Sequence, residues 1–247
     1  MEQNKLKKEP LGNSFFINVS ENHKFGTDAV LLADFCNATA RDKHIDLGTG
    51  CGIIPFLLLR DGKTIESIGV EISEEACALA TKTKEELKLD KFTIINSDLN
   101  DLKGKIEFGC HTLITCNPPY KAPGAGLQNP NERHRVARHE VMCTLEDIIR
   151  VSGKLLQTSG RLCMCHRPER LAELISLLRE YKLEPKRLRT VHQRQAEEPW
   201  LILIEAKKCA KTGLRIDPPL YVEENGDFTA EMKEIYGSYK EAYLNAR

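Results

Sequence analysis

The sequence lacks paired cysteines. Its 247 residues contain nine cysteines, an odd number, and no C-x-x-C pair. The two nearest, Cys163 and Cys165, are separated by one residue, which is the spacing of one face of a strand. The pair His139 and Glu140 lacks the second histidine of a zinc-hydrolase motif. These absences argue against a disulfide framework and a zinc site, so we expect buried free thiols in a reducing cytoplasm and no bound metal.

A long apolar run and an excess of charge of either sign are also missing. No apolar stretch approaches membrane-spanning length, and the lysines of MEQNKLKKEPLGN are not followed by an apolar core. We therefore expect a soluble, cytoplasmic protein with no membrane partner. Lys and Arg number 36 and balance 36 Asp and Glu, so no global field would hold the chain on nucleic acid. A polyanionic partner would have to be met by a local basic patch.

Neither an internal repeat nor a low-complexity linker divides the chain. From HIDLGTG to WLILIEAKK, short apolar runs alternate with longer amphipathic segments, which is typical of βα units around a mainly parallel sheet. We expect an α/β fold with one main domain over residues 41–247, preceded by an extension and a helix within residues 1–40. The expected strands are residues 44–47, 67–71, 93–96, 112–115, 161–166, 187–192 and 201–206.

Capping residues predict where two helices begin. Ser73 precedes two glutamates and a segment with apolar residues at helical spacing. Thr144 and Asp147 stand at the spacing of a capping box, although Asp replaces the preferred Glu or Gln. Near the C-terminus, NGD predicts a turn that is followed by an acidic helix.

A glycine-rich segment follows the first strand of this pattern. HIDLGTGCGIIPFLLL reads as a strand, a turn with Gly48, Gly50 and Gly52, and a helix. Glycines at such a turn let the backbone approach a ligand, and the helix offers its N-terminal amides. Ile53 occupies the position of the third glycine of a dinucleotide fingerprint, which weakens a nicotinamide or flavin interpretation.

Three acidic residues stand at the ends of successive strands. They are Asp46, Glu71 and Asp98, and the carboxyl edge of an open α/β sheet is where such folds bind ligands. Asp98 alone would more often be a cap or turn residue. Carboxylates repel a pyrophosphate but suit ribose hydroxyls, an ammonium and a sulfonium. The pattern therefore favours S-adenosylmethionine over NAD or ATP.

The fourth strand ends at TCNPPYKAP, residues 115–123. Two prolines cannot continue a ladder, and they restrict the residues before them. The Asn117 side-chain oxygen and the Pro118 carbonyl would then form a rigid pair of acceptors for an amino group, and Tyr120 could stack on a planar substrate. The alternative is a strand-ending turn with Tyr120 packed on the core. We expect residues 121–131, rich in Gly, Pro and Asn, to form a mobile loop.

Together these motifs resemble the class I S-adenosylmethionine-dependent methyltransferases of the small methyltransferase group. Within it the sequence is most similar to the bacterial tRNA1(Val) adenine-N6 methyltransferases, through FGTDAVLLADF, ARHE, HRPERL and GLRIDPPLYVEENGDFTAE as well as DLGTGCG and NPPY. The resemblance implies a doubly wound, seven-stranded Rossmann-like sheet with an antiparallel last strand. It also implies a cofactor pocket and a catalytic motif. The pocket comprises Asp46, Gly48, Thr49, Gly50, Gly52, Glu71, Ile72, Asp98, Leu99 and Asn117, and the motif comprises Asn117, Pro118, Pro119 and Tyr120.

The implied activity is methylation of N6 of adenosine in tRNA. The alternatives are a ribosomal RNA guanine-N2 or a protein-glutamine N5 methyltransferase and, from another class, a cofactor-binding RNA adaptor without catalysis. RNA contact would fall to three basic clusters, each of which could equally be an ordinary solvated face. They are Arg133, His134, Arg135, Arg138 and His139; Lys182, Lys186, Arg187, Arg189 and Arg194; and Lys5, Lys7 and Lys8.

Overall fold

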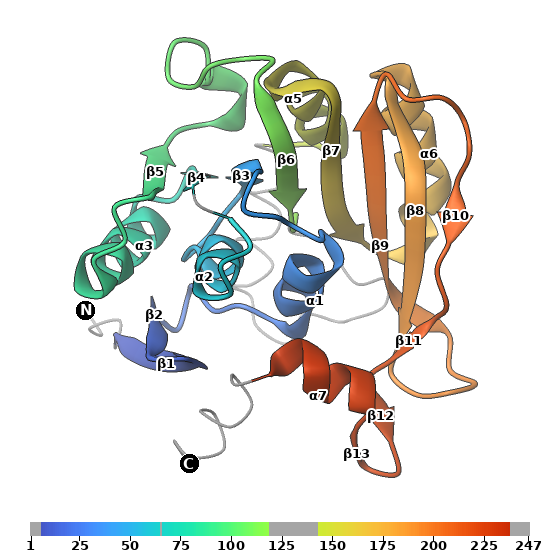
Figure 1. Ribbon diagram of the computed structural model, residues 1–247, viewed down its shortest axis with the longest axis horizontal. Helices are drawn as coiled ribbons and strands as arrows, with labels where there is room; N and C mark the ends of the chain where they lie inside the picture. Colours follow the sequence, from blue (N-terminus) through green and yellow to red (C-terminus); the bar gives the residue numbers. More distant parts are fainter. Residues whose placement is uncertain (1–5, 65, 119–142, 238–247) are drawn as a thin grey trace.

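The computed structural model describes residues 6–64, 66–118 and 143–237. Within these residues, the chain builds a nine-stranded sheet in the order β10-β8-β9-β7-β6-β3-β4-β5, with β11 also paired to β8 (Figure 1). Its seven long strands are β3 (Lys43–Leu47), β4 (Glu66–Glu71), β5 (Phe92–Asn96), β6 (His111–Cys116), β7 (Leu156–His166), β8 (Leu183–His192) and β9 (Pro199–Lys208). The seven expected strands are confirmed in order, with β7 and β8 beginning earlier than their apolar runs suggested.

Strand direction follows the expected doubly wound pattern. β3 pairs in parallel with β4 and β6, and β6 pairs in parallel with β7. β9 is antiparallel to both of its neighbours, β7 and β8, so the antiparallel last strand is confirmed. Beyond β8, the two-residue strands β10 (Arg215–Ile216) and β11 (Leu220–Tyr221) add in parallel along its outer edge.

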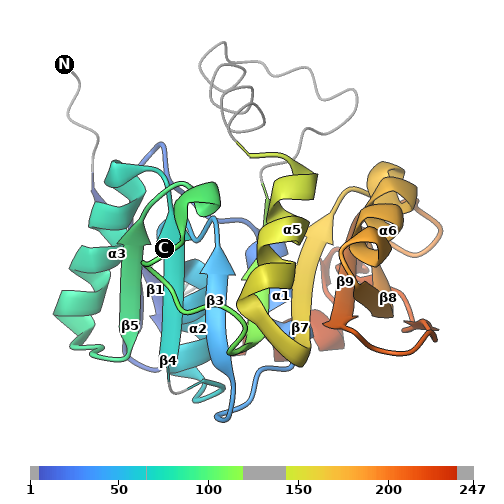
Figure 2. The same ribbon diagram turned by 90° about the horizontal axis from the view of Figure 1, so that it is seen from above.

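Helices cover both faces of the sheet, as Figures 1 and 2 show. One apolar cluster joins α1 (Thr27–Phe35), α2 (Ile53–Arg60) and α3 (Glu74–Leu87) to one face. A second cluster joins α5 (Leu145–Leu155) and α6 (Leu171–Glu180) to the other. Both predicted caps are confirmed: Ser73 accepts from the Ala76 amide, and Thr144 forms a capping box with Asp147. Two 3-10 turns, η1 (Leu99–Asp101) and η2 (Pro168–Arg170), follow β5 and β7.

The segment before α1 contains a hairpin that the sequence did not reveal. Strands β1 (Lys7–Gly12) and β2 (Phe15–Val19) pair antiparallel, and their buried apolar side chains join the cluster of α1, α2 and α3. Asn18 holds the hairpin on α3. Its backbone N–H donates to the Thr83 hydroxyl at 2.9 Å, and its side-chain Nδ2 donates to the same hydroxyl at 3.1 Å.

The chain after β11 folds back beside α1. Strands β12 (Glu223–Glu224) and β13 (Asp227–Phe228) form a hairpin whose turn, Asn225 and Gly226, has positive φ at both residues, as the NGD signal predicted. Helix α7 (Ala230–Tyr236) follows, and the Tyr236 hydroxyl lies 3.0 Å from that of Thr27 at the start of α1 (Figure 1).

A buried ion pair joins β7 to the connection between α1 and β3. The Arg161 guanidinium donates to both Asp42 carboxylate oxygens, at 3.1 and 2.8 Å. Burial alone would raise the pKa of Asp42, but hydrogen bonds from Arg161, Thr112 and the Thr39 amide lower it to about 2. The ionised form of Asp42 is therefore more stable in the folded protein than in the unfolded chain.

Replacing Asp42 by Asn should lower the free energy of unfolding at neutral pH by about 2 kcal/mol. Since the folded pKa lies below the unfolded one, this contribution is complete above about pH 4 and is lost as the pH falls toward 2. Urea unfolding at pH 7, 4 and 3 measures the difference in free energy of unfolding between wild type and Asp42→Asn. We expect this difference to become smaller as the pH falls. Asp90→Asn, at an exposed position, is the control, and a difference that is constant with pH would contradict the expectation.

Candidate active site

Four side chains predicted to act together follow the carboxyl ends of neighbouring parallel strands. Asp46 is the second-to-last residue of β3, Glu71 ends β4, Asp98 follows β5 and Asn117 follows β6. Pairing of Leu47 with both Val70 and Cys116 aligns these strand ends at one edge of the sheet (Figure 2). The chain leaves β3 toward β4 on one side and reaches β6 on the other. This is a topological switch point, where open α/β sheets form their binding crevices.

The glycine loop, residues 48–52, connects β3 to α2. Gly48, Gly50 and Gly52 all have positive φ, at 69°, 57° and 91°. The amides of Gly48 and Thr49 both donate to the Val70 carbonyl of the next strand, at 2.9 and 3.0 Å. A Cβ atom added at Gly48 or Gly50 would meet nothing within 4 Å, so these two glycines leave open space at the edge of the sheet.

Gly52 is needed for a different reason. A Cβ there would lie 2.8 Å from the Phe56 ring and 3.3 Å from that of Phe92. Both rings are fully buried and meet edge to face with centroids 5.0 Å apart. Only the absence of a side chain at Gly52 lets α2 begin this close to the strands.

Gly52→Ala should therefore destabilise the protein by about 3 kcal/mol, from a strained positive φ and from crowding of the two rings. Gly62→Ala is the matched control, because Gly62 also has positive φ (63°) but open space around its Cβ position. It should cost only about 1 kcal/mol. Urea unfolding measures both, and equal losses would show that the ring contacts do not matter.

Glu71 is buried and connects the glycine loop to the start of α3. Its carboxylate accepts from the Gly50 amide at 2.9 Å and from the Ser73 amide at 2.8 Å. The Asn96 side chain donates to the backbone carbonyls of Glu71 and Ile72, at 3.0 and 3.1 Å, and so holds this strand end. Sequence reasoning missed Asn96; its signal is a polar residue at the end of β5, in register with Glu71.

Asp98 and Leu99 lie beside this strand end. Asp98 caps η1 by accepting from the Asn100 amide at 2.8 Å, so it performs the cap function that its position alone suggested. Leu99 packs against the apolar cluster of α5 and α6. Their assignment to the cofactor pocket stays a prediction.

Asp46 is almost fully buried, with 1% of its surface exposed. Burial raises its pKa to about 7, although the Thr115 hydroxyl donates to its carboxylate at 2.6 Å. Thr115 is a second residue that sequence reasoning missed as part of the site. The neighbouring Thr49 hydroxyl is buried and also lowers the pKa of Asp46, although its oxygen has no hydrogen bond of normal geometry within the described residues.

Asn117 and Pro118 directly follow β6. Asn117 is partly exposed, Pro118 is buried, and the Cys165 thiol on β7 donates to the Asn117 side-chain oxygen at 3.0 Å. Cys116 pairs with Met164 in the register of these strands, so Asn117 and Cys165 are next to each other across the sheet. Pro119, Tyr120, the expected loop at 121–131 and the first basic cluster lie outside the described residues.

The second basic cluster is largely occupied by ion pairs. Arg187 approaches Glu205 and Asp217, Arg189 contacts Glu231, and Arg194 contacts Glu197 and Glu223. These arginines bind the C-terminal segment and the β8–β9 connection to the sheet.

In the N-terminal cluster, Lys8 pairs with Glu86 at 3.1 Å and Lys7 approaches Glu9 at 3.8 Å, while Lys5 lies outside the described residues.

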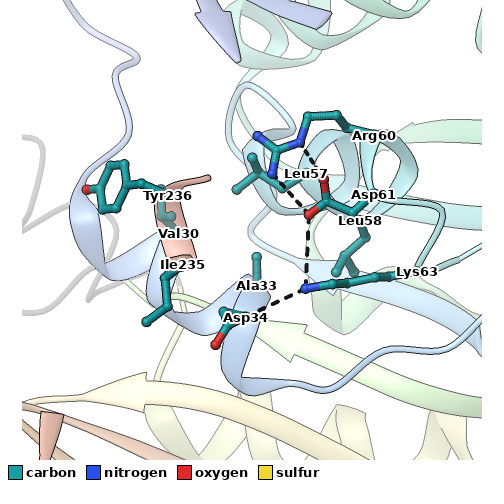
Figure 3. Close-up of a pocket in the computed structure, with 10 residues that line it drawn as sticks. All are labelled: Val30, Ala33, Asp34, Leu57, Leu58, Arg60, Asp61, Lys63, Ile235 and Tyr236. Carbon is teal, nitrogen blue, oxygen red and sulfur yellow. Dashed lines mark hydrogen bonds and ion pairs between the residues drawn. The ribbon is translucent and has the colours of Figure 1, made fainter. Parts of the chain in front are cut away.

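A pocket between α1, α2 and α7 lies apart from this edge of the sheet (Figure 3). It adjoins the C-terminal end of α2, whereas the glycine loop precedes its N-terminal end. Its charged side chains pair with one another: Arg60 contacts Asp61 at 2.6 Å and Lys63 lies 3.6 Å from Asp34 (Figure 3). Among the described residues that line the pocket, no charged side chain is left unpaired for a cofactor.

The described residues fit S-adenosylmethionine at the glycine loop. The open space above Gly48 and Gly50 would admit the ligand, and Asp46 and Glu71 place two carboxylates beside it. In the same described part of the chain, no three His, Cys, Asp or Glu side chains gather as a metal site would need. Nor is any helix there long and apolar enough to cross a membrane.

Known sequences are similar to this chain over most of its length. The family model of the methyltransferase small domain matches residues 20–181. The chain is 28% identical over 221 residues to the tRNA1(Val) (adenine(37)-N6)-methyltransferase of Parabacteroides distasonis, covering 86% of this chain and 90% of that protein. It is 31% identical over 192 residues to the protein of the same name from Porphyromonas gingivalis, covering 74% and 73%.

Solved structures share the fold. A predicted O-methyltransferase from Agrobacterium tumefaciens superposes with a TM-score of 0.66 at 21% identity, over 86% of this chain and 97% of that one. The geranyl diphosphate C-methyltransferase of Streptomyces coelicolor, solved with S-adenosyl-L-homocysteine, gives a TM-score of 0.52 at 13% identity over 73% and 74%. At these identities the likeness establishes the Rossmann-like fold alone.

Proposed function

The chain belongs to the methyltransferase small domain family and is an S-adenosylmethionine-dependent methyltransferase; we propose that it methylates N6 of an adenosine in tRNA. The observation that carries the proposal is the Asn117 side-chain oxygen, which stands at the end of β6, adjacent to the strand that leads into the glycine loop. Relatives that cover most of the chain act, by their names, on adenine 37 of tRNA1(Val). A tRNA substrate would place the protein in the cytoplasm.

The proposed mechanism depends on acceptors rather than on a base. An exocyclic amine is a weak nucleophile because its lone pair is delocalised into the ring. The Asn117 side-chain oxygen and the Pro118 carbonyl would accept its two N–H groups, which draws the nitrogen toward tetrahedral geometry and stabilises the positive charge that develops on it. The cofactor supplies the methyl group on its sulfonium. Alignment of the amine provides much of the rate, and its proton can leave to solvent afterwards.

Asp46, Glu71 and the glycine loop would hold the cofactor. The Glu71 carboxylate has a spare lone pair on each oxygen beyond those used by the Gly50 and Ser73 amides. It can therefore accept from two ribose hydroxyls without releasing the loop. Asp46 would supply negative charge near the cationic amino-acid portion.

Methyl transfer from labelled cofactor identifies the acceptor. The protein is incubated with unmodified tRNA1(Val), with the same tRNA carrying guanosine at position 37, with ribosomal RNA and with a release factor. We expect N6-methyladenosine in the first substrate alone, identified after digestion by mass spectrometry. N2-methylguanosine or methylglutamine would replace the proposal by the corresponding alternative activity. Label in no substrate, from protein that binds the cofactor, would favour a non-catalytic adaptor.

A further inference from the structure

A chain of hydrogen bonds crosses the core beneath the glycine loop, from β4 through β3 to β6. Its members are Ser67, His44, Thr115 and Asp46, each at most 1% exposed. The Ser67 hydroxyl lies 2.9 Å from Nδ1 of His44, whose Nε2 lies 2.8 Å from the Thr115 hydroxyl. Thr115 in turn donates to Oδ1 of Asp46 at 2.6 Å. Strand register sets the arrangement, since His44 pairs with Ser67 and Asp46 with Thr115.

The direction of every proton in the chain follows from Asp46. The Thr115 hydroxyl has one proton and gives it to the carboxylate, so its oxygen must accept from Nε2–H of His44. Burial lowers the pKa of His44 to about 3, so the ring is neutral and Nδ1 carries no proton. Nδ1 therefore accepts from the Ser67 hydroxyl. Each donor points toward Asp46, and the donors favour its ionised form.

Burial and the neighbouring Glu71 carboxylate oppose that form, and together with the other nearby groups they leave the pKa of Asp46 at about 7. Cys116, on the other face of β6, is a buried thiol whose pKa lies well above its usual value, so it adds no charge. The charged or titratable groups near His44 are Asp42, Arg161 and His111. Within the described residues, the side chains that lower the pKa of Asp46 are instead Thr115, which donates to its carboxylate, and Thr49. The balance between burial and the donor chain thus decides whether Asp46 is charged near neutral pH.

We propose that His44 and Thr115 are positioning residues which keep Asp46 ionised, and that this buried chain sets the pH range in which the protein binds S-adenosylmethionine. The inference rests on the proposed place of the cofactor at the glycine loop, where a charged Asp46 would attract its ammonium and sulfonium groups. It goes beyond that assignment, because neither His44 nor Thr115 need touch the cofactor.

Calorimetric titration with S-adenosylmethionine between pH 5.5 and 9 tests the chain. Wild-type affinity should fall as the pH drops below about 7, where Asp46 gains a proton. Thr115→Val removes the donor at nearly constant volume, so the pH of half-maximal affinity should rise by about one unit, with affinity about fivefold weaker at pH 7 and about tenfold weaker at pH 6. Thr115→Ser should restore the wild-type profile. The titration of the cofactor itself is common to all variants and does not affect their differences.

Three further variants distinguish an effect that acts through this chain of hydrogen bonds from a general effect on core packing. Ser67→Ala and His44→Leu should shift the midpoint in the same direction by smaller amounts, because Thr115 still donates to Asp46. His111→Leu is the matched control: His111 is buried on β6 but bonds the Glu107 carbonyl instead of the chain, so its midpoint should not move. Uniform weakening at every pH, or unchanged midpoints in folded chain variants, would overturn the inference. Wild type that binds no cofactor would instead overturn the proposed function.

Discussion

Asn117→Ala should lower turnover about a hundredfold to a thousandfold while cofactor affinity changes by no more than a few fold. The variant removes the oxygen that, in the proposed mechanism, accepts from the amine as positive charge develops on it, and loss of one such preorganised contact has effects of this size on comparable reactions. The Asn117 side chain is partly exposed, so its truncation leaves little cavity. Single-turnover methylation of tRNA together with calorimetric cofactor binding separates the two effects.

Asn117→Asp is the control, because it keeps an oxygen at the position proposed to accept from the amine and replaces the amide NH2 group by a second, negatively charged carboxylate oxygen. It should retain much more turnover than Asn117→Ala. Cys165→Ser tests the neighbouring contact, since a hydroxyl can replace the thiol that donates to Asn117 at 3.0 Å. Turnover by Asn117→Ala close to the wild-type rate would leave NPPY as a strand-ending turn.

The long strands and the caps were predictable because their signals are local. Strand β6 reads as an apolar run between polar segments, and Thr144 precedes Asp147 by three residues in any conformation. The short strands β10 and β11 have no such signal, because two residues cannot form a pattern. They are strands only because β8, at the edge of the long strands, offers its unpaired backbone groups to them.

The hairpin β1–β2 was missed for a related reason. Pro10 lies within β1, and proline argues against a strand except at an edge. In the structure β1 is an edge strand of a two-stranded sheet. Its stability comes from burial of side chains such as Leu11 and Ile17 against helices far along the chain, which no local window contains.

In the candidate site, too, some features have a local sequence signal and others depend on contacts between distant segments. Sequence position alone placed Gly48, Glu71 and Asn117 at the ends of strands, where the structure also has them; their roles stay predictions. His44 reads from sequence only as the first residue of an expected strand, and its hydrogen bonds depend on Ser67 and Thr115, which register places beside it. Likewise Arg187 and Arg189 form a basic run in the sequence, yet acidic residues from β9 and the C-terminal segment pair with them.

Glu71→Gln should weaken cofactor binding about a hundredfold, which corresponds to about 2.7 kcal/mol. Both carboxylate oxygens accept from backbone amides, those of Gly50 and Ser73. An amide side chain has only one oxygen, so its NH2 group must face one of these two donors. The mismatch leaves a backbone N–H unsatisfied, loosens either the glycine loop or the start of α3, and removes one acceptor for the ribose.

Glu74→Gln is the control for this change, because it makes the same substitution three residues later at an exposed position in the first turn of α3. It should lower affinity by less than a factor of two, since the helix loses only a favourable charge near its N-terminus. Adenosine, which keeps the ribose hydroxyls but has no charge, should lose affinity for Glu71→Gln as strongly as S-adenosylmethionine does. A loss confined to the charged ligand would show that Glu71 acts through its charge, and would assign the ribose contact to another residue.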